Sequence, residues 1–370
     1  MKKLLLLTAG LICVLAVSAK KNELPNKKEV ISIMTSVADW QCSQKLRHKV
    51  NDWTNGALYA GMMEFAKMAE SDKYIDWLIE RGEEGKWSKM PRWSGDAKYH
   101  ADDYAVGIMY LEMYRLKKDK KMIQPMRAHL DRILSAPSKR SLDHTWHRHE
   151  SQAERWSWCD ALFMAPTVWT KMYRITNEVK YLEFMYDEYK ATTDFLYDHA
   201  EHLYFRDSRY FHQKEPNGKK MFWGRGNGWV FGGLPIILKE LPDNYYEKMW
   251  FEKLFTDMGE KIASLQDENG YWHASMLDYE SYPNPETSSS SFFVYGLAWG
   301  INNGYLDKEK YLPIVIKGWK ALTEAVYPDG KLGWVQPIGE NPKETKREMT
   351  EVYGVGAFLM AGTEVYKLAD

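Results

Sequence analysis

Six times along this chain, a turn marked by Trp, Gly or Asp opens a helix-like segment of small and aromatic residues. A second and more polar helical segment follows each of them. The openings recur about every 50 to 70 residues, a period typical of repeated helical hairpins. They lie at residues 53–56, 102–103, 158–160, 223–229, 288–293 and 351–354. We therefore predict an all-α fold, a closed (α/α)6 barrel of six helical hairpins, with an open solenoid of helix pairs as the alternative.

The helical spacing is clear within three of these segments, residues 57–69, 105–116 and 162–173, where apolar residues recur every three or four positions. Pro166 lies inside the third segment, so its helix either begins there or bends there. Alternation typical of strands is scarce, and residues 203–211 are the best candidate for a short hairpin. No linker interrupts the body, so we predict one domain over residues 20–370.

The first residues predict an export signal. Lys2 and Lys3 precede an apolar run over residues 4–17, and Ser18 and Ala19 are the small residues expected at a cleavage site. We expect residues 1–19 to be removed, the protein to be periplasmic, and no membrane span elsewhere, since no other apolar stretch is long enough. Ile12 argues against lipidation of Cys13.

Composition narrows the class of partner. The 50 basic residues nearly balance the 51 acidic ones, so no field would attract nucleic acid, and no nucleic-acid motif is present. The 16 Trp and 24 Tyr exceed the 13 Phe. Rings with a polar group suit a sugar-binding surface, although a large helical core is an equal explanation. Cys42 and Cys159 form one disulfide or, as we favour, remain two buried thiols.

In a closed barrel of this kind, the loops that precede the inner helices meet at one end, so candidate site residues should lie at the openings. Asp160 stands among indoles at such a helix start. Apolar surroundings would raise its pKa and let it hold a proton near neutral pH. The alternative is a helix cap, in which the carboxylate accepts backbone N–H groups. Asp102 and Asp103, at another opening, are either partners in acid–base chemistry or residues of a solvated, capping loop.

The sequence Trp-Gly-Arg-Gly-Asn-Gly-Trp at residues 223–229 is the most specific string in the chain. Its three glycines allow positive φ and close approach to a ligand. Arg225, between Trp223 and Trp229, presents a planar fork suited to a carboxylate. A structural alternative is an ion pair between Arg225 and an internal Asp.

Three histidines, His144, His147 and His149, precede Asp160. Their spacing is compatible with a metal site, but no thiolate or second His cluster completes one. We therefore expect no metal and interpret this segment as polar lining of a sugar site. A Ser nucleophile elbow is also absent from the sequence.

Two strings, Trp-Cys-Asp-Ala-Leu-Phe-Met-Ala-Pro at residues 158–166 and the 223–229 string, resemble glycoside hydrolase family 105, the unsaturated rhamnogalacturonyl and related glucuronyl hydrolases. The resemblance covers essentially the whole mature chain. It implies an (α/α)6 barrel and the release of a terminal 4,5-unsaturated uronic acid from lyase-generated oligosaccharides, foremost pectic rhamnogalacturonan fragments. A protonated Asp gives its proton to C4, and water adds at C5. No cofactor is needed.

The resemblance also assigns roles to particular residues. Asp160 stands at the position of the general acid/base, and Asp103, or its neighbour Asp102, at that of the second acidic residue. The residues implied to bind the unsaturated sugar are Trp53, His149, Trp223, Arg225 and Trp229.

Arg206 departs from the family pattern, in a loop where a His is expected. It suggests a different contact, to the neighbouring sugar, a sulfate or a second carboxylate, so the identity of that sugar stays open. An inverting glycosidase or sugar epimerase on the same barrel is one alternative function. A non-catalytic periplasmic carbohydrate-binding protein is another, although a pure binder gains little from buried carboxylates. The oligomeric state cannot be read from the sequence.

Overall fold

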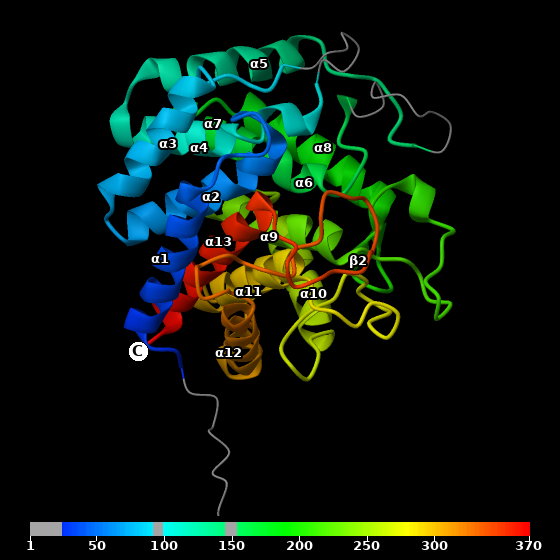
Figure 1. Ribbon diagram of the computed structural model, residues 1–370. Coiled ribbons are helices and arrows are strands. Elements are labelled where there is room, and N and C mark those ends of the chain that lie inside the picture. Colours follow the sequence, from blue (N-terminus) through cyan, green and yellow to red (C-terminus); the bar gives the residue numbers. More distant parts are fainter. Residues whose placement is uncertain (1–23, 92–98, 145–153) are drawn as a thin grey trace, which may run out of the picture.

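The computed structural model describes residues 24–91, 99–144 and 154–370 (Figure 1). Outer and inner helices alternate along this part of the chain. The outer helices are α1 (Lys27–Ser43), α3 (Asp72–Glu84), α5 (Gln124–Ser135), α8 (Lys180–Leu196), α10 (Lys248–Ser264) and α12 (Lys308–Glu324). The inner helices are α2 (Trp53–Met68), α4 (Gly107–Lys117), α7 (Pro166–Thr176), α9 (Gly224–Glu240), α11 (Thr287–Asn302) and α13 (Val352–Leu368).

The inner helices form a closed ring. Each packs against the next, in the order α2, α4, α7, α9 and α11, and α13 packs against both α11 and α2. In Figure 1 the last inner helix, α13, lies beside the first, α2. Since the first and last hairpins meet, the structure is a closed (α/α)6 barrel and the open solenoid is excluded.

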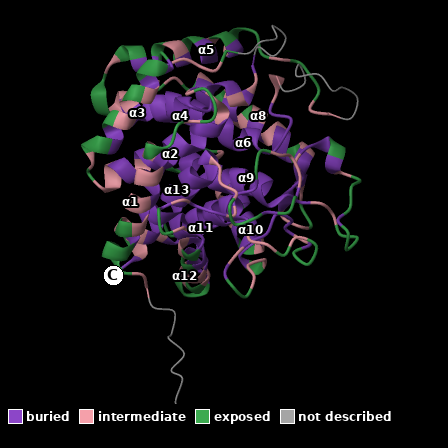
Figure 2. Cartoon of the chain, viewed as in Figure 1, coloured by how far each residue is buried: buried purple, intermediate pink, exposed green. Residues whose placement is uncertain are grey.

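Inner and outer helices differ in burial as the sequence pattern predicts. Almost every residue of α9, α11 and α13 is buried, whereas the outer helices keep an exposed polar face. Figure 2 shows this contrast as a purple centre with green at the rim. Burial of the apolar faces of both layers is the main stabilising term of such a fold.

Short elements connect the hairpins. They are η1 (Ala101–Tyr104), η2 (Lys120–Met122), α6 (Ala161–Met164), β1 (Tyr197–Asp198), β2 (Leu203–Tyr204) and η4 (Ser208–Tyr210). The predicted hairpin at 203–211 is right only in part. β2 forms an antiparallel pair with β1, which precedes it in the chain, and Ser208–Tyr210 is a 3-10 turn. Pro166 begins α7, where its missing N–H costs nothing.

Cys42 and Cys159 are both free thiols; Cys159 is buried and Cys42 only partly so. The predicted free thiols are therefore confirmed, but full burial holds for Cys159 alone. Among the described residues, no helix combines the length and apolarity needed to cross a membrane.

Helices α2 and α13 touch through their backbones. A Cβ added at Gly61 would fall on the carbonyl of Gly356, and one added at Gly356 would fall on the carbonyl of Ala57. The missing side chains therefore allow the two helices that close the ring to meet.

We expect Gly356→Ala to destabilise the protein by about 1–3 kcal/mol, the cost of overpacking, in chemical denaturation. Gly259→Ala in α10 is the matched control, since its Cβ would make ordinary contacts of 3.5–3.6 Å. Higher helix propensity should leave this control as stable as wild type or more so. Equal stability of G356A and wild type would refute the close-contact argument.

Candidate active site

The second and third openings lie against each other. Helix α6, which begins after Asp160, packs on η1, which contains Asp102 and Asp103. The ring of His100 lies 4.7 Å from that of Trp158. The side chain of Asp103 is fully buried, with its Oδ2 3.4 Å from Lys89 Nζ. Asp102 is partly exposed and its Oδ2 lies 3.7 Å from His100 Nδ1. The fold thus brings together the acidic openings predicted to share a site.

Asp160 does not act as a helix cap. It occupies the N-cap position of α6, but its side chain makes no capping hydrogen bond. It is 8 % exposed, and burial raises the pKa of its carboxyl, although the charges of Arg206 and Arg225 oppose this. A buried carboxyl with a raised pKa and no capping role suits a proton donor.

Two groups converge on one oxygen of Asp160. The Cys159 thiol donates to Oδ2 at 3.6 Å, and Arg206 Nε lies 3.4 Å from the same oxygen. The backbone N–H of Cys159 also donates to the carbonyl of Arg206 at 2.8 Å. These contacts fix the carboxyl on its Oδ2 side. In the protonated acid they favour the proton on Oδ1, because the Cys159 thiol and the Arg206 cation already face Oδ2.

Arg206 belongs to an ion-pair network. Its Nη1 donates to Asp207 Oδ2 at 2.7 Å. Asp207 is fully buried and also accepts from Arg209 Nη2 at 2.8 Å. Burial alone would raise the pKa of Asp207, but Arg209 and Arg206 hold it below its usual value. The departure noted in the sequence therefore lies in contact with the candidate acid.

Arg225 is buried between two rings. Its guanidinium carbon lies 4.5 Å from the ring of Trp223 and 4.7 Å from that of Tyr353. The expectation that Trp229 flanks it is wrong, because Tyr353 holds that place. In the described residues Arg225 forms no ion pair with an internal Asp; it donates instead to the carbonyls of Gln336 and Pro337. Arg225 is thus a buried cation held in place by two backbone carbonyls.

The glycines of the 223–229 string have another role than predicted. Gly224, Gly226 and Gly228 lie within α9, and none has positive φ. A Cβ on Gly224 would collide with the carbonyl of His273, and one on Gly226 would approach Cys159 Sγ at 3.0 Å. They allow α9 to pack closely beside the Asp160 opening, so the expectation of positive φ is wrong.

Aromatic rings from three openings meet beside Arg225. Trp53 stacks on Tyr353 with centroids 5.8 Å apart, and Trp229 meets Trp53 edge-on at 6.2 Å. Trp53 is partly exposed, while Trp229 is fully buried against Phe163 and Phe292. Trp53 is therefore the ring of this cluster that is open to a ligand.

Tyr353 and Gln336 were not predicted as site residues. The Tyr353 hydroxyl donates to the Gln336 carbonyl at 2.7 Å, and Trp223 Nε1 donates to Gln336 Oε1 at 3.0 Å. Tyr353 lay in an opening that the sequence had marked, so that signal existed. Nothing in the sequence marked Gln336.

The histidine segment is described only in part. His144 Nε2 lies 2.5 Å from Ser157 Oγ, and burial lowers the pKa of His144. His147 and the predicted substrate-binding His149 lie outside the described residues. Within the described part of the chain, no group of three metal-ligating side chains comes together.

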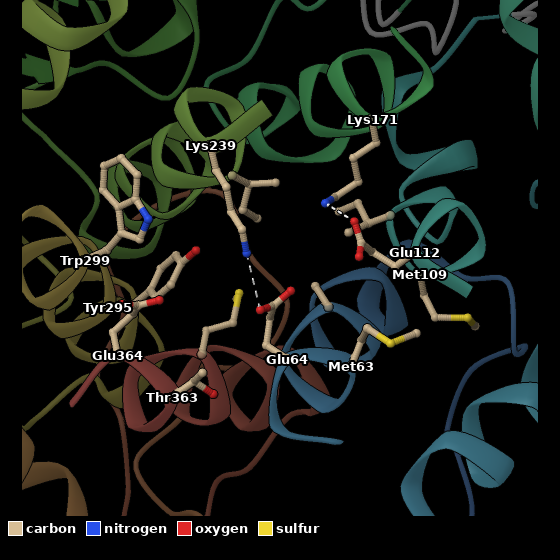
Figure 3. Close-up of a pocket in the computed structure, with 14 residues that line it drawn as sticks. Met63, Glu64, Met109, Glu112, Lys171, Lys239, Tyr295, Trp299, Thr363 and Glu364 are labelled. Atoms are coloured by element: carbon tan, nitrogen blue, oxygen red, sulfur yellow. Dashed lines mark hydrogen bonds and ion pairs between the residues drawn. The ribbon is translucent and has the colours of Figure 1, made fainter. Parts of the chain in front are cut away.

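A separate pocket lies at the opposite end of the inner helices (Figure 3). Its wall carries Glu64, Glu112, Lys171 and Lys239 over an apolar floor that includes Met63. Lys171 binds Glu112 at 2.6 Å, and Lys239 lies 3.7 Å from Glu64. Both lysines of this pocket are thus paired with its carboxylates, whereas the buried carboxyl without a capping role lies at the other end, so the candidate active site is the end that holds Asp160.

A closed helical barrel with a buried acid, a buried arginine and a partly exposed indole at one end suits an enzyme that acts on sugars. A model of Glycosyl Hydrolase Family 88 matches residues 26–369, and the chain belongs to this family.

Two similar proteins support the assignment, and a third shares the fold. An unsaturated 3S-rhamnoglycuronyl hydrolase of Formosa agariphila is 38 % identical over 97 % of each chain. The structure of a family 88 glycosyl hydrolase from Bacteroides vulgatus is 32 % identical, with a TM-score of 0.82 over 93 % of this chain and 99 % of that one. A possible member of family GH105 from Salmonella enterica, 17 % identical, shares the fold with a TM-score of 0.75 over 94 % and 96 %.

These comparisons confirm the predicted family resemblance and the all-α barrel. The chain is a glycoside hydrolase of the group that acts on unsaturated uronic acids.

Proposed function

We propose that this enzyme releases the terminal 4,5-unsaturated uronic acid from lyase-generated oligosaccharides, with Asp160 as the proton donor. The observation that carries the proposal is the Asp160 carboxyl, which is buried, does not cap a helix, and has a raised pKa. A donor must be protonated when the cycle begins, and this environment favours the protonated form.

The proposed reaction consumes one water. Asp160 gives its proton to C4, and positive charge develops at C5 and the ring oxygen. Water adds to C5 and gives up one proton, which the Asp160 carboxylate takes back, so that the donor is restored; Asp103, on the η1 segment that packs against α6, is the candidate second acidic residue that orients the water. The resulting hemiketal opens, and the bond to the neighbouring sugar breaks. Proton transfer and stabilisation of the developing charge are the two demands on the protein.

For the neighbouring sugar, we propose a sulfated rhamnose. The relative that is 38 % identical is named for a 3S-rhamnoglycuronyl substrate. Arg206 lies beside the candidate acid, and Arg209 shares the carboxylate of Asp207 with it, so two cations lie together next to this end of the site. This differs from the pectic fragments favoured by the sequence.

The test is the ultraviolet absorbance of the C4=C5 bond, which hydration removes. Wild-type enzyme should abolish this absorbance in unsaturated disaccharides that end in sulfated rhamnose, and act more slowly on pectic ones. Release of sugar with unchanged absorbance would instead indicate a glycosidase that attacks the anomeric carbon.

Replacement of Arg206 should move the pH profile. The charge of Arg206 lowers the pKa of Asp160, so Arg206→Met should raise that pKa and keep the acid protonated to higher pH. The alkaline limb of kcat/KM would then shift upward in pH, measured with the absorbance assay. A limb that stays in place, or moves to lower pH, would show that Asp160 is not the group that titrates.

We also propose export to the periplasm, supported by the signal pattern at residues 1–19. Mass spectrometry of protein isolated from the periplasm should find a chain that begins at Lys20.

A further inference from the structure

Arg206 and Arg209 meet at one exposed carboxylate. Glu340 Oε2 lies 2.7 Å from Arg209 Nη2 and 3.6 Å from Arg206 Nη1. The Glu340 side chain is 45 % exposed, and it stands in a segment without helix or strand. Solvent-exposed ion pairs contribute only about 0–1 kcal/mol. Glu340 can therefore leave the two arginines at small cost.

The two guanidinium groups do not need Glu340 to keep their places. Buried Asp207 accepts from Arg206 Nη1 at 2.7 Å, and from Arg209 Nε and Nη2 at 2.9 and 2.8 Å. Asp207 therefore fixes the plane of the Arg209 guanidinium at two points and holds that of Arg206 at Nη1. Both guanidinium groups therefore stay in place when the Glu340 carboxylate leaves, and another anion can take its position.

The charge balance of the cluster points to an anionic ligand. Arg206 and Arg209 carry two positive charges, and Asp207 neutralises one. In the proposed reaction Asp160 is protonated and neutral. Glu340 alone then balances the remaining positive charge, and its departure leaves a cationic site for one anion.

We propose that Arg206 and Arg209 form the receiving site for a sulfate ester on the sugar next to the unsaturated uronic acid, and that Glu340 fills this site until substrate displaces it. The proposal rests on the proposed function. Arg206 connects binding of the sulfate ester with proton donation by Asp160. Its Nε lies 3.4 Å from Asp160 Oδ2, and its Nη1 lies 3.6 Å from Glu340 Oε2. The anion site and the proton donor thus share one guanidinium.

The experiment measures kcat/KM for two unsaturated disaccharides that differ only in the sulfate. We expect Glu340→Gln to raise the ratio of sulfated to unsulfated kcat/KM several-fold, because the internal competitor is gone. Arg209→Gln should lower the ratio about tenfold, the scale of one charge-assisted hydrogen bond. Glu348→Gln, a change on an exposed residue farther along the same connection, should keep the wild-type ratio.

A second measurement does not depend on a folded Arg209 variant. Inorganic sulfate should inhibit competitively, and more strongly in E340Q than in wild type. Ratios and inhibition that are the same in E340Q, R209Q and wild type would overturn the sulfate site while leaving the proposed function in place. Equal changes toward both disaccharides would also overturn it, since the site would then serve the uronate carboxylate. No turnover of either disaccharide by wild type would instead reject the proposed function.

Discussion

Asp160→Asn should lower kcat for hydration of the unsaturated bond by about 10²- to 10⁴-fold, the contribution usual for a general acid. Asparagine keeps the shape of the side chain but cannot give a proton to C4. Loss of ultraviolet absorbance at saturating substrate measures the effect. Stability should not fall, because Asp160 caps no helix and the variant removes a group whose charged form burial disfavours.

Asp307→Asn is the matched control. Asp307 is a true cap, whose carboxylate accepts from the N–H of Lys310 at 2.8 Å, and Asn serves as well at such a position. Its activity should equal that of wild type. If Asp160→Asn kept the wild-type rate but lost stability, Asp160 would have a structural role and the acid would have to be sought elsewhere.

Local patterns explain why so much of the fold was predictable. An inner helix needs small and apolar residues all round, and its opening needs a turn, so each of the six units carries its own signal in sequence. Asp160 was found for the same reason, because Trp156 and Trp158 stand beside it in the sequence and mark this opening.

Contacts between distant segments could not be predicted. Arg225 is paired with the carbonyls of Gln336 and Pro337, more than a hundred positions away, and no local pattern records that pairing. Its second flanking ring was assigned to Trp229 because Trp229 is close in sequence, whereas the fold supplies Tyr353. Likewise the sequence marked Arg206 as a departure but gave no sign of its contact with Glu340.

The charges at the opposite end of the barrel were also hidden in the sequence. In the sequence, Glu112, Lys171 and Glu240 look like ordinary polar positions of their helices, yet all three side chains are buried. The packing of three successive inner helices, α4, α7 and α9, places Lys171 Nζ 2.6 Å from Glu112 and 3.0 Å from Glu240.

Lys171→Met should destabilise the protein by about 3–5 kcal/mol, the cost of removing one partner from a buried ion cluster. The buried carboxylates of Glu112 and Glu240 would then share the cations that remain, mainly Arg115, which contacts both. Denaturant unfolding near neutral pH measures the loss. Lys190→Met, which breaks the exposed pair with Asp194, is the control and should cost less than about 1 kcal/mol.

At acidic pH, the difference in free energy of unfolding between Lys171→Met and wild type should become smaller. Burial alone would raise the pKa of Glu240, but Arg115 and Lys171 hold it at about 2, below its ordinary value of 4.5. A depressed pKa contributes stability that is fully present above the unfolded value and is lost as pH falls toward the folded one. The variant has less of this stability to lose, so its deficit should be smaller at about pH 3 than at about pH 7. A deficit that did not change with pH would mean that lost packing of the lysine stem, and not lost charge, sets the cost.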